Sequence, residues 1–305
     1  MRKFLTNIGI ALGILLCVAW IADDRLTHLF RGGRTVKAQW QDKMHGEHFD
    51  VAIIGSSRAL WNIDMNAINA RCGLHAISLA NNHFRPAEML LALKIFLRNG
   101  NTTKRLLIQV DSSVLTDEQE GFSSTLYDFV PFLEDTLIYD YLYQRDAEWS
   151  WLRHVPFWRY AKYNFKWGLE QTLRTALGSR SDPFDSTGSY FSPNDRFYCS
   201  YNYSFEPKIA PHFGEDLKAL ITLCRSNGIE PVVFSSPNFM VASPEAVRAA
   251  PHRLLAAEGL VLYDFSDSLN TEANFNDNRH LNRTGGALHT VADRSGDLSI
   301  AGVAN

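Results

Sequence analysis

Short apolar runs alternate with segments of helical spacing along most of the chain. The run at 49–54 is largely apolar and stops at Gly55, a pattern typical of a strand buried inside a parallel sheet. The segment at 86–97 has apolar residues at helical spacing and a proline in its first turn, which predicts a helix. The same patterns predict further strands at 75–79, 105–110, 231–234 and 260–265, and further helices at 59–70, 214–226, 244–257 and from Asn282 onward.

Five strands that alternate with helices predict an α/β domain with a doubly wound parallel sheet in three layers, α/β/α. In such sheets ligands bind beside the carboxyl ends of the strands, near the point where the strand order reverses. Residues that directly follow the predicted strands are therefore the first candidates for a functional site.

An uncharged apolar stretch at 4–22 precedes this pattern. Its length is close to the ~17–20 residues that a helix needs to cross a bilayer. The basic residues Arg2 and Lys3 precede it and two acidic residues follow it, which places the rest of the chain outside the cytoplasm. A cleaved signal peptide is the alternative, although Trp20 is bulky where a cleavage site needs small residues. We therefore expect a retained single-pass anchor with a periplasmic or extracellular domain.

The alternation of strands and helices lapses at about 116–212, which we expect to be a helical insertion. Residues 1–24 would then be a membrane anchor, 25–48 a stalk, and 49–305 the domain that carries the insertion. Exposed Trp and Tyr side chains in the insertion would suit stacking on sugar rings, but in helices they more often fill a small core, and they also favour membrane interfaces. We expect most to be core residues. The aromatic residues are Trp149, Trp151, Phe157, Trp158, Tyr160, Tyr163, Phe165 and Trp167.

Composition and charge narrow the class of function. The 305 residues are 46% apolar and 21% charged, which is enough apolar material for a sizeable core. The formal net charge is −3 and the basic residues form no stripe, so no feature points to nucleic-acid binding. Of the four cysteines, Cys17 lies in the anchor and the other three form no CxxC pair. We therefore expect no zinc site built from cysteines, while one disulfide, whose pairing the sequence does not give, is possible.

Two serines follow the first predicted strand. Gly55, Ser56, Ser57 and Arg58 lie at the turn into the next helix, where a hydroxyl is exposed and backbone N–H groups can face a developing oxyanion. Serine is also favoured at such a turn as a helix N-cap. From this motif alone, a nucleophilic serine and a helix N-cap are about equally well supported.

An acid and a base lie near the C-terminus. Asp277 and His280 are three residues apart, ahead of the last predicted helix. A carboxylate so close can fix the tautomer of the histidine, whose other ring nitrogen then accepts a serine proton. For this motif alone, a solvated loop in which Asp277 forms a turn is the alternative. The functional interpretation therefore depends on the combination of the two motifs.

The combination resembles the SGNH (GDSL-like) hydrolase superfamily, which has a flavodoxin-like three-layer fold. That family carries its nucleophile in a Gly-Asp-Ser block after the first strand and its acid and base in an Asp-x-x-His block near the C-terminus. Gly55-Ser56-Ser57 matches the first block with Ser in place of Asp, and Asp277 and His280, followed by Leu-Asn, match the last. The resemblance implies a triad of Ser57, Asp277 and His280, with Ser57 rather than Ser56 as the nucleophile.

The resemblance covers nearly all of the chain after the anchor, apart from the aromatic insertion. It looks most like the membrane-anchored extracytoplasmic branch, which includes alginate O-acetylation proteins and the D-alanyl-transfer protein of teichoic acids. It implies an esterase or O-acyltransferase that acts on a cell-envelope polysaccharide and needs no metal or organic cofactor. The implied partners are membrane lipid around the N-terminal helix, a polysaccharide or acylated substrate, and a membrane-bound acyl-transfer protein.

Two blocks that supply oxyanion donors in that family differ here. Its second block supplies a glycine N–H, where this chain has Asn81, Asn82 and His83 after the second strand. Its third block supplies an asparagine, where this chain has Asp111, whose negative charge would repel an oxyanion. Asn82 can offer a side-chain amide instead. Arg58 and His83 are further candidates for substrate contacts, with capping of the helix as the alternative role of Arg58.

Asp111 also supports a second hypothesis from another class of function. A chain without a working oxyanion site would be a non-catalytic SGNH-like scaffold, or a carbohydrate-binding partner in a polysaccharide assembly or export complex. An ester-hydrolysis assay, or labelling with a serine-directed reagent, separates this hypothesis from the enzyme.

Overall fold

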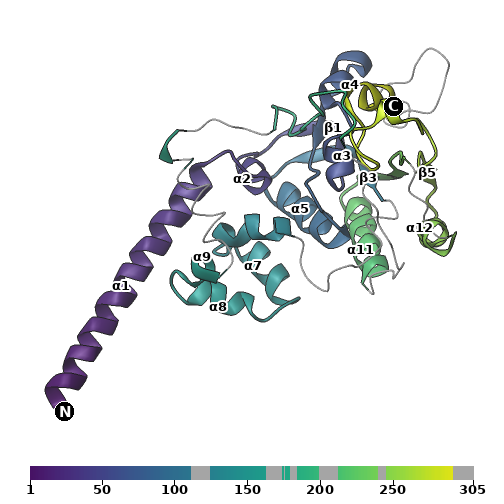
Figure 1. The fold of residues 1–305 in the computed structure, drawn as a ribbon. Coiled ribbons are helices and arrows are strands. Elements are labelled where there is room, and N and C mark those ends of the chain that lie inside the picture. Colours follow the sequence, from purple (N-terminus) through teal and green to yellow (C-terminus); the bar gives the residue numbers. More distant parts are fainter. Residues whose placement is uncertain are drawn as a thin grey trace. The chain divides into compact units, whose positions relative to one another are not determined.

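The computed structural model describes residues 1–110, 124–162, 174, 176–178, 184–198, 212–239 and 245–290 (Figure 1). Asp111 and Cys199 lie outside these residues, as do Tyr163, Phe165 and Trp167 of the predicted aromatic insertion. The chain divides into two compact units. The first joins Met1–Lys43 to Leu126–Pro183, and the second joins Met44–Thr125 to Phe184–Asn305.

The second unit contains the sheet and all of the predicted site residues that the structure describes. Its elements in chain order are β1 (His48–Ile54), α3 (Ser57–Leu60), α4 (Met65–Cys72), β2 (Ala76–Ser78), α5 (Pro86–Arg98), β3 (Thr102–Gln109), α11 (Phe213–Ser226), β4 (Glu230–Ser235), α12 (Glu245–Ala257), β5 (Leu262–Asp264), η2 (Glu272–Asn274) and α13 (Arg283–Thr290).

The five strands form one sheet in the order β2-β1-β3-β4-β5, with every neighbouring pair parallel. The prediction of an α/β fold with a five-stranded parallel sheet is confirmed. From β1 the chain moves to β2 on one side, and it then crosses back to β3 on the other. The carboxyl ends of β1 and β3, where Ile54 pairs with Ile108, therefore form the switch point of the sheet.

Helices cover both faces of this sheet. Because the connections from β1 to β2 and from β2 to β3 run in opposite directions, right-handed crossovers place α4 and α5 on opposite faces. α5 packs on α11, and Gly214 of α11 lies against Leu254 of α12, whereas α4 packs on α13. The core that includes Ile68 of α4 also contains Ile53, Leu107 and Phe234 from the strands, all fully buried.

The prediction of one helix at 59–70 is wrong, because α3 and α4 are separate helices. Asp64 accepts a hydrogen bond from the Ala67 N–H at 3.1 Å and caps α4, so a new helix starts inside a stretch of helical apolar spacing. In the turn between the two helices, Asn62 Oδ1 accepts the Leu281 N–H at 3.0 Å. The break in the helix thus ties the end of α3 to the loop before α13.

The first unit combines the N-terminal helix with part of the predicted insertion. Its elements are α1 (Arg2–Gly32), α2 (Lys37–Asp42), η1 (Ser124–Phe132) from Leu126 onward, α7 (Thr136–Tyr143), α8 (Trp149–His154) and α9 (Trp158–Lys162). By length and apolar composition α1 can cross a membrane, and no residue of its apolar part is buried. It continues to Gly32, so the first residues of the segment predicted as a stalk are helical, and Thr27 and Phe30 pack inside the unit.

Candidate active site

The turn from β1 into α3 is closely packed. A Cβ at Gly55 would lie 2.6 Å from Gln109 Cβ and 2.8 Å from Ala59 Cβ, so a larger residue would displace its neighbours. Ser56 is the N-cap of α3: its Oγ accepts the Arg58 N–H at 3.3 Å and donates to Gln109 Oε1 at 2.8 Å. The Ser56 N–H donates to the same oxygen at 2.9 Å. Gln109, the last residue of β3, therefore fixes the turn and occupies the Ser56 hydroxyl.

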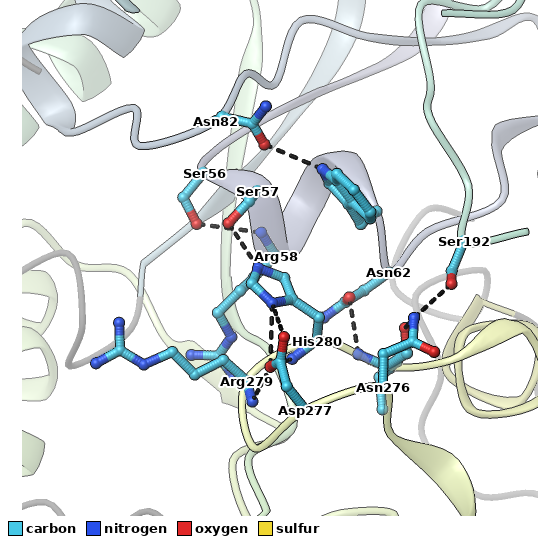
Figure 2. Close-up of polar contacts among 12 residues, drawn as sticks. Ser56, Ser57, Arg58, Asn62, Asn82, Ser192, Asn276, Asp277, Arg279 and His280 are labelled. Carbon is cyan, nitrogen blue, oxygen red and sulfur yellow. Dashed lines mark hydrogen bonds and ion pairs between the residues drawn. The ribbon is translucent and has the colours of Figure 1, made fainter. Parts of the chain in front are cut away.

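The neighbouring hydroxyl faces the loop before α13, as Figure 2 shows. Ser57 Oγ lies 2.8 Å from His280 Nε2, and His280 Nδ1 lies 2.9 Å from Asp277 Oδ2. An ionised carboxylate only accepts hydrogen bonds, so Nδ1 carries the ring proton and Nε2 is left to accept the Ser57 O–H. The structure thus brings together the three residues that sequence analysis nominated as a triad.

Asp277 is held in its ionised form. Burial raises the pKa of its carboxyl group, but hydrogen bonds from the His280 ring and from the N–H groups of Arg279 and His280 outweigh burial, so its pKa lies below the usual value. The Arg279 N–H donates to Asp277 Oδ1 at 2.8 Å and the His280 N–H at 2.9 Å. One carboxylate therefore both orders the loop and orients the imidazole.

The loop that carries these two residues is closed on itself. Phe275 and Leu281 form an antiparallel bridge, and the Asn276 N–H donates to the His280 carbonyl at 2.8 Å. The side chain of Asn276 also donates to Ser192 Oγ at 2.6 Å (Figure 2). These contacts hold the backbone of the loop before and after His280 in place.

Arg58 follows Ser57 in sequence but faces the interior. It is 2% exposed, and its Nη2 donates to the Ser236 carbonyl at 2.5 Å and to the Pro237 carbonyl at 2.6 Å. We expected either a substrate contact or a capping role for Arg58. Its burial takes the guanidinium out of reach of a substrate beside Ser57, and its contacts are with the segment that follows β4.

That segment leads back to the loop of the acid and the base. The Phe239 N–H, two residues after Pro237, donates to the Asn278 carbonyl at 3.1 Å, next to Asp277. Arg58 therefore connects the turn that carries the serine with the loop that carries its partners.

Asn82 reaches the site through a tryptophan. Asn82, labelled in Figure 2, accepts the Trp61 Nε1–H through its Oδ1 at 3.0 Å. The Trp61 ring centroid is 6.0 Å from that of His280. The Asn82 backbone N–H donates to Asn81 Oδ1 at 2.9 Å. Since its side-chain oxygen is occupied, the amide nitrogen of Asn82 is the group left to meet a substrate, and no acceptor for it is found among the described residues.

His83 lies at the edge of the same site. Its backbone is in the left-handed region, with φ of 58°, and its side chain is exposed to solvent. Partial burial of the ring lowers the pKa of His83, and electrostatic interactions with His280, Arg85 and Arg279 lower it further. The lowered pKa favours the uncharged ring, which can offer a hydrogen bond or a stacking face. The position of Asp111 lies outside the described residues.

Sequence reasoning missed the residues that support the triad: Gln109, Trp61, Asn62, Asn276 and Ser192. One signal was present, because a glutamine that ends an otherwise apolar strand at a switch point needs a polar partner. The other partners come from distant parts of the chain, and no local pattern joins them.

No protein-family model and no curated protein sequence matches this chain. Within the residues that the structure describes, His, Cys, Asp and Glu form no group of three that could hold a metal ion. A hydroxyl, an imidazole and a carboxylate in line beside the carboxyl ends of parallel strands can transfer a proton from the hydroxyl to the imidazole as the oxygen attacks a carbonyl carbon.

Proposed function

We propose that the chain is a membrane-anchored serine esterase or O-acyltransferase of the SGNH type that acts on an acylated polysaccharide of the cell envelope. The observation that carries the proposal is the relay of Ser57 Oγ, His280 and Asp277, with separations of 2.8 and 2.9 Å. Distances in this range meet the geometric requirement for a nucleophile and its general base.

In the first half of the reaction, Ser57 Oγ attacks the carbonyl carbon of an acyl donor and its proton moves to His280 Nε2. The tetrahedral intermediate then expels the donor alcohol, which takes that proton from His280, and the acyl group stays on Ser57. In the second half, water or a sugar hydroxyl attacks the acyl-serine while His280 takes its proton and returns it to Ser57. Water completes a hydrolysis, and a sugar hydroxyl completes a transfer.

The donors proposed for the oxyanion differ from the glycine and asparagine of the SGNH family. The Ser57 N–H is at the first position of α3, where a helix leaves its N–H groups without internal partners, and no acceptor for it is found among the described residues. The second donor is the Asn82 amide, which the Trp61 indole orients. Each such donor is typically worth about 10²–10³ in rate.

The SGNH assignment is supported by the strand order and by the placement of the motifs. The order 2-1-3-4-5 is that of flavodoxin-like sheets, and Ser57 follows β1 at the switch point while Asp277 and His280 precede the last described helix. The extracytoplasmic location is supported by the apolar part of α1, which Arg2 and Lys3 precede and two acidic residues directly follow.

An ester-hydrolysis assay on the full chain in detergent, with a small activated acetyl ester as the substrate, tests the proposal. We expect turnover that Ser57→Ala reduces by at least about 10³-fold, because the variant keeps the fold and loses the nucleophile. Ser56→Ala is the matched control and keeps most of the activity, since its hydroxyl is bonded to Gln109. No turnover by the folded wild-type chain, or turnover that survives Ser57→Ala, would favour a non-catalytic scaffold or carbohydrate-binding protein.

A further inference from the structure

We propose that the first unit contacts the membrane through a surface of α8 and α9 that carries Trp151 and Trp158, here named the α8–α9 surface. Trp151 is 65% exposed and Trp158 is 42% exposed, although the neighbouring Trp149 and Leu152 are buried. Large aromatic side chains exposed in this way mark a contact with another molecule or with a membrane. The position of α1 indicates which of the two, another molecule or a membrane, contacts this surface.

The end of the apolar part of α1 fixes the height of α9 above the bilayer. The uncharged stretch ends at Ala22, and the next residue, Asp23, accepts the Phe157 N–H at 2.7 Å and the Arg159 Nε–H at 3.0 Å. One turn further along α1, Thr27 Oγ1 lies 2.6 Å from Tyr160 Oη. α9 therefore begins at the level where α1 leaves the hydrocarbon and extends away from it.

This attachment is rigid, because its polar groups are buried and paired. Asp23 and Arg159 are 6% and 4% exposed, and removal of either partner would leave a buried charge alone. Phe157 is held in the left-handed backbone region, with φ of 65°, which is unfavourable for a bulky residue and persists only where its surroundings impose it. α9 consequently cannot slide along α1 without loss of these contacts.

A short turn joins α8 to α9, and hydrogen bonds within the turn together with one ion pair hold the two helices together. The Val155 N–H donates to the Trp151 carbonyl at 3.0 Å, the Trp158 N–H donates to the Val155 carbonyl at 3.1 Å, and Lys162 pairs with Glu148. With Trp149 and Leu152 turned into the core, the remaining face of α8 presents Trp151 outward.

A lipid surface fits this arrangement because the start of α9, where Trp158 lies, is bonded to α1 at the end of its membrane-crossing part. Trp20, three residues before Asp23, is exposed on α1 itself. Trp20, Trp151 and Trp158 are therefore expected to form a belt where α1 leaves the hydrocarbon, and indole rings favour the layer between the hydrocarbon and water. The occupant we infer is the outer leaflet of the bilayer that α1 crosses, independent of any catalytic role of Ser57.

Quenching of tryptophan emission by brominated lipid tests this inference. The full chain carrying Trp20→Phe is reconstituted in phosphatidylcholine vesicles, with or without phosphatidylcholine brominated near the headgroup end of its acyl chains. We expect the brominated lipid to quench part of the emission, and Trp151→Phe with Trp158→Phe to remove most of that quenched part. Trp40→Phe is the matched control: Trp40 belongs to α2, beyond the end of α1, and its removal should leave the quenched part unchanged.

Two results would overturn the inference. A quenched part that persists without Trp151 and Trp158 means that solvent, a second copy or another protein covers the α8–α9 surface. A quenched part that falls as much with Trp40→Phe means that the unit meets the bilayer without a preferred face.

Discussion

Three consecutive residues on the β1–α3 turn have side chains with different tasks. Ser56 bonds to Gln109, Ser57 faces His280, and Arg58 lies in the interior on the carbonyls that follow β4. In the proposed mechanism, this division leaves Ser57, and not Ser56, available as the nucleophile. In the same mechanism, Arg58 positions Ser57 and does not bind substrate.

Substitution of Arg58 distinguishes positioning from binding. We expect Arg58→Met to lower kcat by about 10–100-fold with little change in KM, because a small displacement of the nucleophile weakens the attack and leaves substrate contacts intact. Arg58→Lys, which keeps a donor for one of the two carbonyls, should restore part of kcat. Steady-state kinetics on an ester substrate provide the measurement, and a raised KM with unchanged kcat would instead assign Arg58 to substrate binding.

Asn82 is the second residue whose role can be tested by substitution, through its side-chain amide. If it donates to the oxyanion, Asn82→Ala should lower kcat by about 10²–10³-fold. Trp61→Phe removes the indole N–H that orients Asn82 but keeps a ring beside His280, so it should cost much less. Equal losses in the two variants would mean that Asn82 acts only as a partner of Trp61.

His289 is buried beside Phe265 and takes no part in the triad. Burial lowers the pKa of His289 to about 3, and the charge of Arg58 contributes to the decrease. In the unfolded chain the pKa of a histidine is about 6.5. At a pH between about 3 and 6.5, the unfolded chain therefore binds a proton at His289 that the folded chain does not bind. The free energy of unfolding consequently decreases as the pH falls below about 6.5.

Thermal or urea unfolding at pH 7.5 and 5.5 measures this effect. The loss of stability due to His289 over that interval should be about 1.4 kcal/mol, and His289→Leu should remove that part of the pH dependence. An identical pH dependence in the two proteins would contradict the assignment of a neutral buried imidazole.

At the scale of elements, the close packing of the β1–α3 turn against the end of β3 sets the position of Ser57. Gly55→Ala would insert a methyl group 2.6 Å from Gln109 Cβ, and we expect a loss of about 1–3 kcal/mol of stability together with most of the esterase activity. Gly214→Ala is the control, since its methyl group would meet only the end of the Leu254 side chain at 3.1 Å and alanine favours the helix. Unfolding and kinetic measurements on both variants should separate them, and similar effects would remove the special role of the β1–α3 turn.

The elements that sequence predicted best are those whose signal is local. Continuous apolar runs predicted the strands, because β1 and β3 are buried on both faces near their carboxyl ends. The break between α3 and α4 was missed because Asn62 and Asp64 lie within a stretch whose apolar spacing continues past them, and tertiary contacts to Leu281 and Ala67 decide the break.

The site was predictable only in part for the same reason. Ser57, Asp277 and His280 could be nominated because they stand at ends of elements and match a known order. The partnership of Ser56 with Gln109 spans 53 residues and that of Asn62 with Leu281 spans 219 residues, and neither leaves a local pattern. The inward direction of Arg58 depends on carbonyls 178 and 179 residues away.

For the whole molecule, the division into two units places the apolar helix α1 in one unit and the candidate triad in the other. Met1–Lys43 and Leu126–Pro183 combine the apolar helix with the α8–α9 surface, whereas Met44–Thr125 and Phe184–Asn305 contain the sheet and the triad. In the proposed function, a polymer substrate outside the cytoplasm would suit an enzyme with its membrane helix in one unit and its nucleophile in the other.

The central claim is that His280 activates Ser57 as a nucleophile, and mapping of a fluorophosphonate adduct tests it most directly. The full chain in detergent is treated with the reagent, digested and analysed by peptide mass spectrometry. We predict one adduct on the hydroxyl of Ser57, retained in Ser56→Ala and lost in Ser57→Ala and His280→Ala. No adduct on the folded wild-type chain, or an adduct on Ser57 that forms equally well without His280, would contradict the account.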